Sequence, residues 1–247
     1  MPRQARKKSN SGIYHIMLRG INRQQIFEDD EDRARFLETL QIYKKQCGYA
    51  IYAYCLMGNH IHLLIKEGQE DLTQIFKRIA GRYVYWYNWK YHRCGHLFQD
   101  RFKSEPVETD EYFLTVLRYI HQNPVKAKLC KYAQEYAYSS MNEYLSCAKL
   151  TDTDFALSMI TIEQFSDFHR EENADQCLEI SDNFRMTDAD AKELLRKISK
   201  CDNATEFQML DIEKRNLYIH KLHQKGMSIR QISRLTGLSK KIIERNI

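Results

Sequence analysis

The sequence has no long hydrophobic run, no internal repeat and no low-complexity tract. Its apolar runs are far shorter than the ~20 residues that cross a bilayer, so no membrane-spanning helix is expected. The basic residues 1–8 are followed by the polar residues 9–12 and not by an apolar segment, which argues against a secretory signal. A chain of 247 residues has room for one large domain or two small ones, and we expect it in the cytoplasm.

Paired cysteines are also lacking. The seven cysteines are odd in number and widely scattered, and no two of them are spaced as Cys-x-x-Cys. This distribution is not typical of a disulfide framework or of a zinc site. We therefore expect reduced thiols, which agrees with a cytoplasmic location.

Acidic residues are scarce at the two ends of the chain and frequent in between. Residues 1–150 carry a formal net charge of +7, residues 151–210 of −8 and residues 211–247 of +6, which gives +5 for the whole chain. Two basic regions that flank an acidic one indicate a polyanionic partner, of which nucleic acid is the commonest. The alternative is that these charges only solvate the surface.

Two histidines are adjacent on one predicted strand. Residues 54–65 are mostly apolar and favour β-structure, with a Gly-Asn turn at residues 58–59. His60 and His62 open the second strand, and residues i and i+2 of a strand point to the same face. Two imidazoles side by side can bind a divalent cation if another group completes the coordination. The alternative is a chance pair of surface or core histidines.

The predicted elements follow the order β-α-β-β-α-β and are followed by a further helix. This order is typical of the ferredoxin-like, split βαβ arrangement, an α+β fold in which helices cover one face of an antiparallel sheet. It places the strand of His60 and His62 centrally, with one face open for chemistry. The predicted strands are residues 13–18, 49–57 and 60–66 and one that ends near residue 107, and the predicted helices are residues 29–47, 71–92 and 109–122.

The third predicted helix carries polar residues along one edge of its buried stripe. Thr109 or Asp110 can cap its N-terminus. Asn123 precedes a proline and is expected to end the helix, because proline lacks an N–H donor and restricts the residue before it. At ~100° per residue, Tyr112, Tyr119 and Asn123 line up. We expect them to face a cleft, neither fully buried nor fully exposed.

Aromatic residues crowd the second half of the second predicted helix, over residues 83–89. Exposed rings of this kind can stack on unpaired bases of a nucleic acid. Packing of the helix against the sheet is the alternative, and it is the interpretation that we favour for most of these rings.

The C-terminal residues form a helix-turn-helix pattern. Residues 213–223 are expected to be helical, and residues 228–243 show a helix, a glycine turn and a second helix. Ser239 can cap a basic helix over residues 239–246, which would be the recognition helix. A helical hairpin without a DNA role is the alternative. The residues expected to face inward are Ile229, Ile232, Leu235, Leu238 and Ile242.

Several short motifs together resemble the single-tyrosine HUH transposases, and most closely the REP-associated tyrosine transposases. The resemblance covers roughly residues 10–145 and excludes the acidic region and the helix-turn-helix, although some relatives carry an added C-terminal DNA-binding module. Each motif alone is weak, but their joint occurrence in this order is specific. The motifs are His15 with Arg19-Gly20, Asn22-Arg23, Gly58 to His62, Gly95 with Phe98-Gln99 and Arg101 to Lys103, and Tyr119 to Lys126.

The resemblance implies a ferredoxin-like domain that nicks and rejoins single-stranded DNA near a hairpin. Residue by residue, His60 and His62 match the metal-binding histidines and Tyr119 matches the nucleophile. Asn123 matches the third metal ligand, which is glutamine in some relatives. Tyr112 is the second candidate for the nucleophile. The phenol would form a 5′-phosphotyrosine and free a 3′-hydroxyl, and a Mg²⁺ or Mn²⁺ ion would polarise the scissile phosphate.

The expected domains are a basic tail at residues 1–12, a catalytic domain at residues 13–150, an acidic connector with short helices at residues 151–210 and the helix-turn-helix at residues 211–247. Phosphate contacts fix the position of a protein on DNA without reading its sequence. The candidates for such contacts are Arg3, Arg6, Lys7, Lys8, Arg19 and Arg23 and, in the C-terminal region, Lys240, Lys241 and Arg245.

Two other functions compete with this one. A sequence-specific DNA-binding regulator with an inactive HUH domain would explain the helix-turn-helix, but not the joint presence of His60, His62, Tyr119 and Asn123. A replication initiator or relaxase of the wider HUH group is disfavoured by the compact size and by the absence of a helicase segment. A mobile transposase and a domesticated host protein remain alternatives, as do a monomer and a homodimer.

Overall fold

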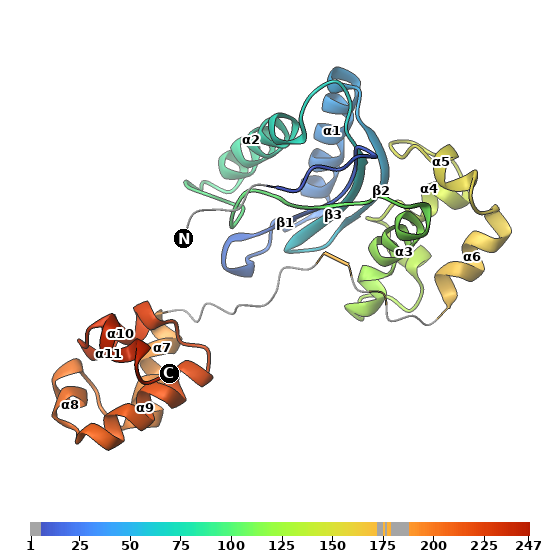
Figure 1. Cartoon of the computed structure of the whole chain (residues 1–247). Coiled ribbons are helices and arrows are strands. Elements are labelled where there is room, and N and C mark those ends of the chain that lie inside the picture. The colour runs from blue at the N-terminus through green and yellow to red at the C-terminus, as the bar shows by residue number, and fades with distance from the viewer. Residues whose placement is uncertain (1–5, 172–174, 176, 179–187) are drawn as a thin grey trace. The chain divides into compact units, whose positions relative to one another are not determined.

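The computed structural model describes residues 6–171, 175, 177–178 and 188–247 (Figure 1). The chain divides into two compact units, residues 1–179 and residues 180–247. All seven cysteines are free thiols, as expected. Over the described ranges, no helix combines the length and the apolar character that crossing a membrane requires.

The N-terminal unit is built on a four-stranded antiparallel sheet. Its strand order is β2-β3-β1-β4, so that β3 and β1 are the central strands. This order confirms the predicted ferredoxin-like α+β fold. In the register of β1 and β3, Arg19 pairs with His60. The strands are β1 (Ile13–Arg19), β2 (Ala50–Leu56), β3 (His60–Lys66) and β4 (Lys103–Pro106).

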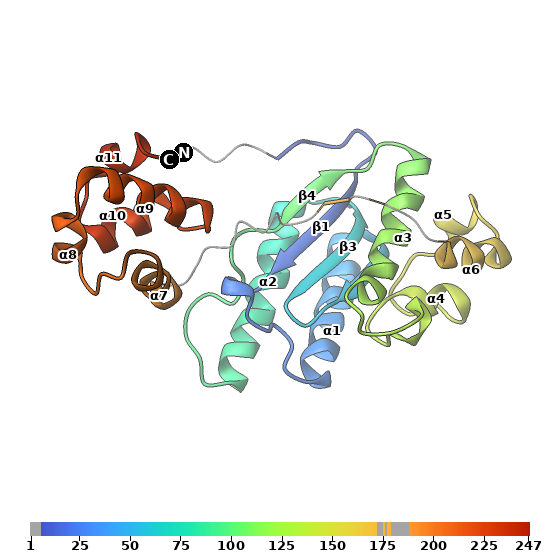
Figure 2. The ribbon, with the colours of Figure 1, turned by 90° about the horizontal axis from the view of Figure 1, so that it is seen from below.

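Helices cover both faces of this sheet (Figure 2). The two helices of the split βαβ units, α1 (Asp30–Cys47) and α2 (Leu72–Lys90), lie on one face, as expected. The following helix, α3 (Asp110–Lys126), packs across β2 and β3 on the opposite face. The face that we expected to be open for chemistry is therefore roofed by the helix that carries Tyr119.

The central strand β3 sends alternate side chains into two separate cores. Ile61, Leu63 and Ile65 are buried against α1 and α2. Leu64 is buried on the other face, among side chains of α3. This alternation follows from the two-residue period of a strand and places His60 and His62 on the α3 face.

The α3 helix is longer than expected, because it ends at Lys126 and includes Pro124. Thr109 is its cap, and its side chain accepts a hydrogen bond from the N–H of Tyr112. The expectation that Asn123 ends the helix was therefore wrong. Proline removes one helical hydrogen bond, but Pro124 is buried, and we attribute the extra turn to its packing.

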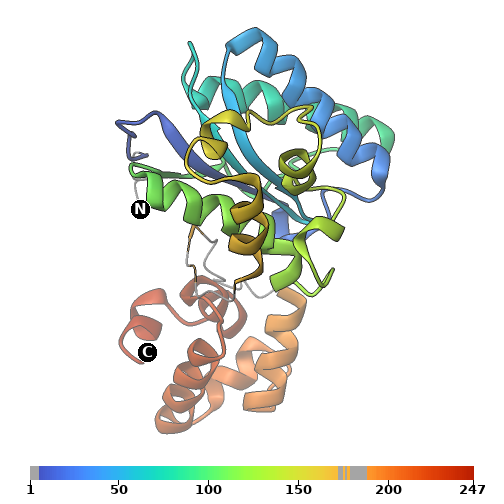
Figure 3. The same cartoon turned by 90° about the vertical axis from the view of Figure 1, so that its right-hand side faces the viewer.

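Residues 133–170 form short helices that pack on the α3 side of the sheet, so the first unit extends well beyond residue 150. Figure 3 shows α3 and the helices α5 and α6 in front of the strands. The region that we expected to be one connector, residues 151–210, is instead divided between the two units. The elements are η2 (Ala133–Glu135), α4 (Met141–Leu145), α5 (Asp154–Leu157) and α6 (Ile162–Arg170), and the turn η1 (Ile21–Arg23) follows β1.

The described part of the C-terminal unit, residues 188–247, is a bundle of five helices around its own core. Gly237 has a φ of 69° and turns the chain between α10 and α11, where a Cβ would lie 2.2 Å from the side chain of Gln208. Ser239 caps α11, as expected. Ile243 is buried here and Ile242 is exposed, which corrects the predicted inward face. The helices are α7 (Asp188–Ser199), α8 (Ala204–Met209), α9 (Ile212–Gln224), α10 (Ile229–Thr236) and α11 (Lys240–Glu244).

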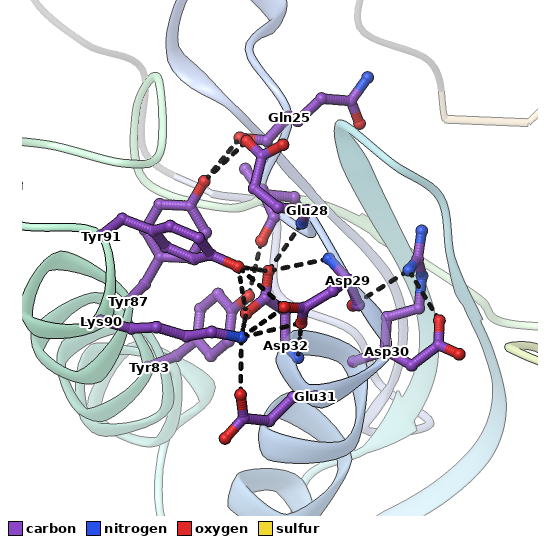
Figure 4. A network of polar contacts seen from close by, with 12 residues as sticks. Gln25, Glu28, Asp29, Asp30, Glu31, Asp32, Tyr83, Tyr87, Lys90 and Tyr91 are labelled. Carbon is purple, nitrogen blue, oxygen red and sulfur yellow. Dashed lines mark hydrogen bonds and ion pairs between the residues drawn. The ribbon is translucent and has the colours of Figure 1, made fainter.

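A buried carboxylate joins the start of α1 to the end of α2 (Figure 4). Asp32 is fully buried, and it forms a capping box with Asp29. Its carboxylate accepts hydrogen bonds from Lys90 at 2.9 Å and from the Tyr91 hydroxyl. Burial alone would lower the pKa of Lys90, but hydrogen bonds to Asp29, Glu31 and Asp32 raise it overall.

Replacing Asp32 by alanine should lower the free energy of unfolding by about 3 kcal/mol, because the change removes a helix cap and the buried partner of a cation. Urea denaturation measures this loss. Glu38→Ala is the matched control: Glu38 pairs with Arg35 on the same helix but is half exposed, so it should cost no more than about 0.5 kcal/mol. Equal effects of the two changes would contradict a structural role for the buried network.

A chain of buried hydrogen bonds ties α3 to α6. The Nδ1 of His169 donates to the carbonyl oxygen of Phe165 at 2.8 Å, so its Nε2 accepts from Nδ1 of His121 at 2.9 Å. The Nε2 of His121 then accepts from the Ser140 hydroxyl at 2.7 Å. One neutral tautomer of each histidine satisfies the whole chain.

Burial lowers the pKa of His169 from its usual value of 6.5 to about 4. On acidification the unfolded chain takes up this proton first, so the contribution of His169 to stability is complete above about pH 6.5 and is lost between pH 6.5 and 4. The loss should reach about 3 kcal/mol at 1.36 kcal/mol per pH unit. Unfolding experiments across this range on the wild type and on His169→Phe should show the shallower pH dependence in the variant. Parallel curves would disprove the assignment.

Candidate active site

The two histidines predicted to share a face do so at the start of β3. The ring centroids of His60 and His62 lie 5.2 Å apart, with the rings nearly perpendicular. His60 is half-buried, and His62 is almost completely buried. Both lie beneath α3, at the edge of the sheet where β3 begins and its antiparallel neighbour β1 ends.

Asn59 orients the imidazole of His60. The Nδ2 of Asn59 donates to the carbonyl oxygen of Arg23 at 3.3 Å, so its Oδ1 is the atom that faces Nδ1 of His60, at 2.6 Å. An amide oxygen only accepts, and Nδ1 of His60 must therefore carry the proton. This leaves the lone pair of His60 on Nε2, which is the nitrogen that a metal ion requires.

His15 on the neighbouring strand orients His62 in the same way. Its Nε2 lies 2.9 Å from Nδ1 of His62. The other nitrogen of His15, Nδ1, is buried without a hydrogen-bond acceptor in the part of the chain that the structure describes, and a carboxylate oxygen of Glu105 lies 3.9 Å from it. A nearby carboxylate favours an N–H over a lone pair, so Nδ1 of His15 carries the proton. His62 then donates from Nδ1 and keeps its lone pair on Nε2.

Both of these buried imidazoles are neutral at physiological pH. Burial lowers the pKa of His15 to about 3. Burial also lowers the pKa of His62 well below its usual value, and the neighbouring His15 and His60 lower it further. Metal ligation requires the neutral form of imidazole, so His62 needs no deprotonation before it can bind a cation.

Tyr119 projects from α3 onto these rings. Its ring centroid lies 5.7 Å from that of His62 and 5.8 Å from that of His15, edge to face in both cases. The Lys126 ammonium lies 4.6 Å from the centroid of the Tyr119 ring. Tyr119 is 2% exposed, whereas we expected it to be half-exposed. The structure therefore brings the predicted nucleophile into contact with the histidines, but buries it there.

Tyr112 and Asn123 occupy different surroundings on the same helix. Tyr112 lies two turns earlier, next to Glu105, and burial followed by its hydrogen bond to Glu105 raises its pKa. Asn123 is half-buried, as expected, and its Nδ2 donates to the carbonyl oxygen of Tyr119 at 3.0 Å. Among the described residues, the Asn123 amide has no contact with either histidine. Its side-chain oxygen is the atom that would serve as a ligand.

Residues from the middle of the acidic region lie beside this site, which the sequence did not indicate. The Asp175 carboxylate accepts from Arg118 at 2.8 and 3.1 Å, and the Asp175 carbonyl oxygen accepts from Lys126. The N–H of Leu178 donates to Glu105 at 3.0 Å. Parts of the presumed connector therefore contact the residues next to Tyr119.

The basic residues proposed to contact DNA are placed as follows. Arg3 lies outside the described residues. Arg6 is held within the domain, since it donates to the carbonyl oxygen of Phe102 and lies over that ring at 3.7 Å. Arg19 and Arg23 lie near His60, at the end of β1 and in the following turn. The exposed candidates are Lys7, Lys8 and Arg23 in the first unit and Lys240, Lys241 and Arg245 in the second.

The donor set fits a divalent cation that accepts nitrogen ligands. His60 and His62 each bind a protein partner through Nδ1, and this outer contact is typical of metal-binding histidines. No group of three His, Cys, Asp or Glu side chains that could hold a metal occurs within the described ranges. Further ligands would have to be of another kind, such as the Asn123 oxygen or a phosphate of the substrate, and this fits Mg²⁺ or Mn²⁺ better than a structural zinc site.

Three orienting residues were missed as functional candidates, namely His15, Asn59 and Glu105. His15 and Asn59 belong to motifs noted in the sequence, but their roles depend on tautomers that only the contacts show. Glu105 carried no signal. It pairs with His15 across β1 and β4. The sequence predicted only where this edge strand ends, and not which of its residues pair with those of β1.

Comparisons with known proteins found one family model and solved structures of transposases. A family model described as "Transposase IS200 like" matches residues 8–123. The solved structure of a REP-associated tyrosine transposase bound to a REP hairpin aligns with 73% of this chain and 100% of its own, with 17% identity and a TM-score of 0.54. A candidate transposase from Deinococcus radiodurans R1 aligns with 55% of this chain and 98% of its own, with 16% identity and a TM-score of 0.35. The comparison with curated proteins found no match.

The first of these structures supports the fold, and the family model supports the family. The matched residues 8–123 contain β1 to β4 and all but the last turn of α3, and with them His15, His60, His62 and Tyr119. The domain that holds the candidate site is therefore similar to the family of IS200-like transposases.

Proposed function

We propose that this protein is a transposase of the REP-associated, single-tyrosine kind and that it nicks and rejoins single-stranded DNA next to a hairpin. The observation that carries the proposal is the packing of the Tyr119 ring against the rings of His62 and His15. Their spacing allows one phosphate to be reached from the phenol and from the imidazoles. The structural neighbour that is bound to a REP hairpin supports a hairpin substrate.

In the first step, the Tyr119 oxygen loses its proton and attacks the scissile phosphorus in line. The P–O3′ bond breaks, which leaves a 5′-phosphotyrosine and a free 3′-hydroxyl. In the second step, a 3′-hydroxyl attacks the same phosphorus, and the tyrosine leaves. The covalent bond conserves the energy of the phosphodiester, so rejoining needs no nucleotide cofactor.

The chain positions these groups on rigid elements. His60 and His62 present Nε2 lone pairs from a central strand, and Asn123 presents an amide oxygen one helical turn after Tyr119. A divalent cation held by these residues would supply Lewis-acid polarisation of a non-bridging phosphate oxygen. Arg19 and Arg23 contribute positive charge next to His60, which orients the DNA backbone without reading its sequence.

The C-terminal unit would add a second DNA contact. The short helix α11 follows a glycine turn and carries exposed Lys240 and Lys241, with Arg245 directly after it. We assign it to the recognition position of a helix-turn-helix. A helical hairpin without a DNA role is the alternative, and DNA binding by residues 180–247 alone would distinguish the two.

Tyr119→Phe should abolish the covalent adduct, because it removes the attacking oxygen and keeps the ring. The measurement is incubation of a labelled hairpin oligonucleotide with Mn²⁺, followed by denaturing electrophoresis. Tyr112→Phe is the matched control and should keep the adduct, and EDTA should prevent it. An adduct that persists in Tyr119→Phe would disprove the nucleophile. A salt-sensitive mobility shift without nicking in the wild type would favour a DNA-binding regulator.

His15→Leu should weaken Mn²⁺ binding about 10- to 100-fold, as loss of an outer partner of a metal-binding histidine does. The change keeps the side-chain volume roughly constant and removes the acceptor of the His62 Nδ1–H. His15→Gln is the control, because its amide oxygen can still accept this proton and should restore most of the affinity. Isothermal titration calorimetry or electron paramagnetic resonance of Mn²⁺ measures the affinity of the protein for the ion in the absence of DNA. Equal affinities of wild type and His15→Leu would contradict the orienting role.

A further inference from the structure

One face of α2 presents aromatic rings to solvent. Lys77, Gly81, Tyr85 and Trp89 follow one another at four-residue intervals, and such residues form a row along a helix. Tyr85 is 78% exposed and Trp89 is 70% exposed, whereas Tyr83 and Tyr87 are buried. Packing in the core therefore explains Tyr83 and Tyr87, but it does not explain the exposed rings of Tyr85 and Trp89.

Gly81 leaves a gap in this row of side chains, although no neighbouring atom requires a glycine there. A Cβ at this position would meet no atom within 4 Å, and the residue is in the interior of a helix. Glycine in a helix interior costs stability relative to alanine. A cost that internal packing does not require points to something that approaches the helix backbone from outside.

A cavity of about 800 Å³ adjoins this row, between α2 and residues 96–102. Its lining includes Arg6, Lys77, Gly81, Tyr85, Phe98 and Arg101. A smaller hollow of about 330 Å³ continues along the helix and is lined by Arg35, Arg82, Tyr85, Trp86 and Trp89. Tyr85 borders both, and we call the two neighbouring hollows together the α2 groove.

The α2 groove has an excess of positive charge, because Asp100 is the one acidic residue among those that line its two hollows. No residue between Leu72 and Lys90 is acidic. Arg78 is paired with Glu70, and Lys90 with the carboxylates at the start of α1. Lys77, Arg82 and Arg101, in contrast, have no ion-pair partner in the part of the chain that the structure describes. Unpaired cations that alternate with exposed rings fit a phosphate backbone and its unstacked bases.

The wall of the α2 groove is hydrogen-bonded to the strand beside the candidate active site. Phe98 bridges to Gly20, and the N–H of Gln99 donates to the carbonyl oxygen of Arg19. Arg19 in turn pairs with His60 across β1 and β3. Two inter-strand spacings, roughly 10 Å, therefore separate the backbones of Phe98 and His60. A DNA strand could pass from one to the other around the end of the sheet.

We propose that the α2 groove binds unpaired bases of the DNA strand that continues from the cleaved phosphate, with Tyr85 and Trp89 as stacking surfaces. The proposal rests on the proposed function, because it places this groove on the path of the same DNA strand. Gly81 gives the strand room to approach the helix, and Lys77, Arg82 and Arg101 bind its phosphates. A protein partner would leave these three cations buried without counter-charges.

Tryptophan fluorescence, excited at a wavelength that tyrosine does not absorb, reports on this groove alone, because Trp86 and Trp89 are the only tryptophans of the chain. Titration of the full-length protein with a 15-nucleotide oligothymidine should quench this fluorescence saturably, and more weakly at high salt. Tyr85→Ala should weaken binding about tenfold, as loss of one stacked base does. Tyr132→Ala is the matched control, since Tyr132 is exposed but lies outside the groove, and should bind as the wild type does.

Gly81→Leu is the decisive variant. Its side chain enters open space, so the fold should persist and melt no lower than the wild type, while binding of the oligothymidine should fall at least tenfold. Binding and quenching equal to the wild type would overturn the proposal. If this variant does not fold, Tyr85→Ala decides the matter by the same criteria. Dimerisation that Trp89→Ala abolishes would assign the groove to a second copy and would also overturn it.

The two proposals can fail separately. If the hairpin substrate is nicked normally by a Gly81→Leu protein that also binds oligothymidine normally, the groove proposal fails and the proposed function stands. If quenching depends on Gly81 and Tyr85 but no adduct forms with Tyr119 intact, the groove stands as a single-strand binding site and the proposed function fails.

Discussion

The hydrogen bond between His15 and His62 decides what this site can do. At 2.9 Å it joins two central strands beneath α3, and it fixes which nitrogen of His62 keeps its lone pair. The carboxylate of Glu105 on β4 selects the tautomer of His15, so three adjacent strands determine the chemistry of one imidazole. Had the proton been on Nε2 of His62, the pair of histidines would be unable to hold a cation together.

The same strand that presents the histidines also anchors the domain. Ile61, Leu63 and Ile65 of β3 fill the core under α1 and α2, while His60 and His62 alternate with them toward α3. A shift of register by one residue would bury the histidines in the wrong core and expose the apolar residues. Burial energy on one face therefore holds His60 and His62 in position on the other.

Much of this arrangement follows from local sequence patterns. The alternation of β3, the turn at residues 58–59 and the helical spacing of Tyr119 and Asn123 are local, and all were predicted. The contact of His15 with His62 joins residues 47 positions apart and depends on the register of two strands. The hydrogen bond between His169 and His121 joins residues 48 positions apart and depends on how two helices pack. Long-range packing sets both registers, so no short segment contains them.

Smaller errors have local causes of the same kind. Pro124 was expected to stop α3, because the backbone rule for proline is strong, yet the residue is buried and the helix continues to Lys126. Ile243 replaces Ile242 as the buried residue of α11, because a helix of five residues is too short for its phase to be read from periodicity. In each case tertiary packing outweighed a local preference.

The centre of the site is electrically neutral, and its surroundings are positive. Burial keeps His15 and His62 uncharged. Tyr119 lies between these two imidazoles and the Lys126 ammonium, and it is almost fully buried. The cations lie outside this centre, at Arg19, Arg23 and Lys126. Such a rim attracts a polyanion, and under the proposed function the desolvated groups inside would act on the single phosphate that the rim positions. Charge placed inside instead would have raised the cost of burying the site without improving its selectivity for one phosphate.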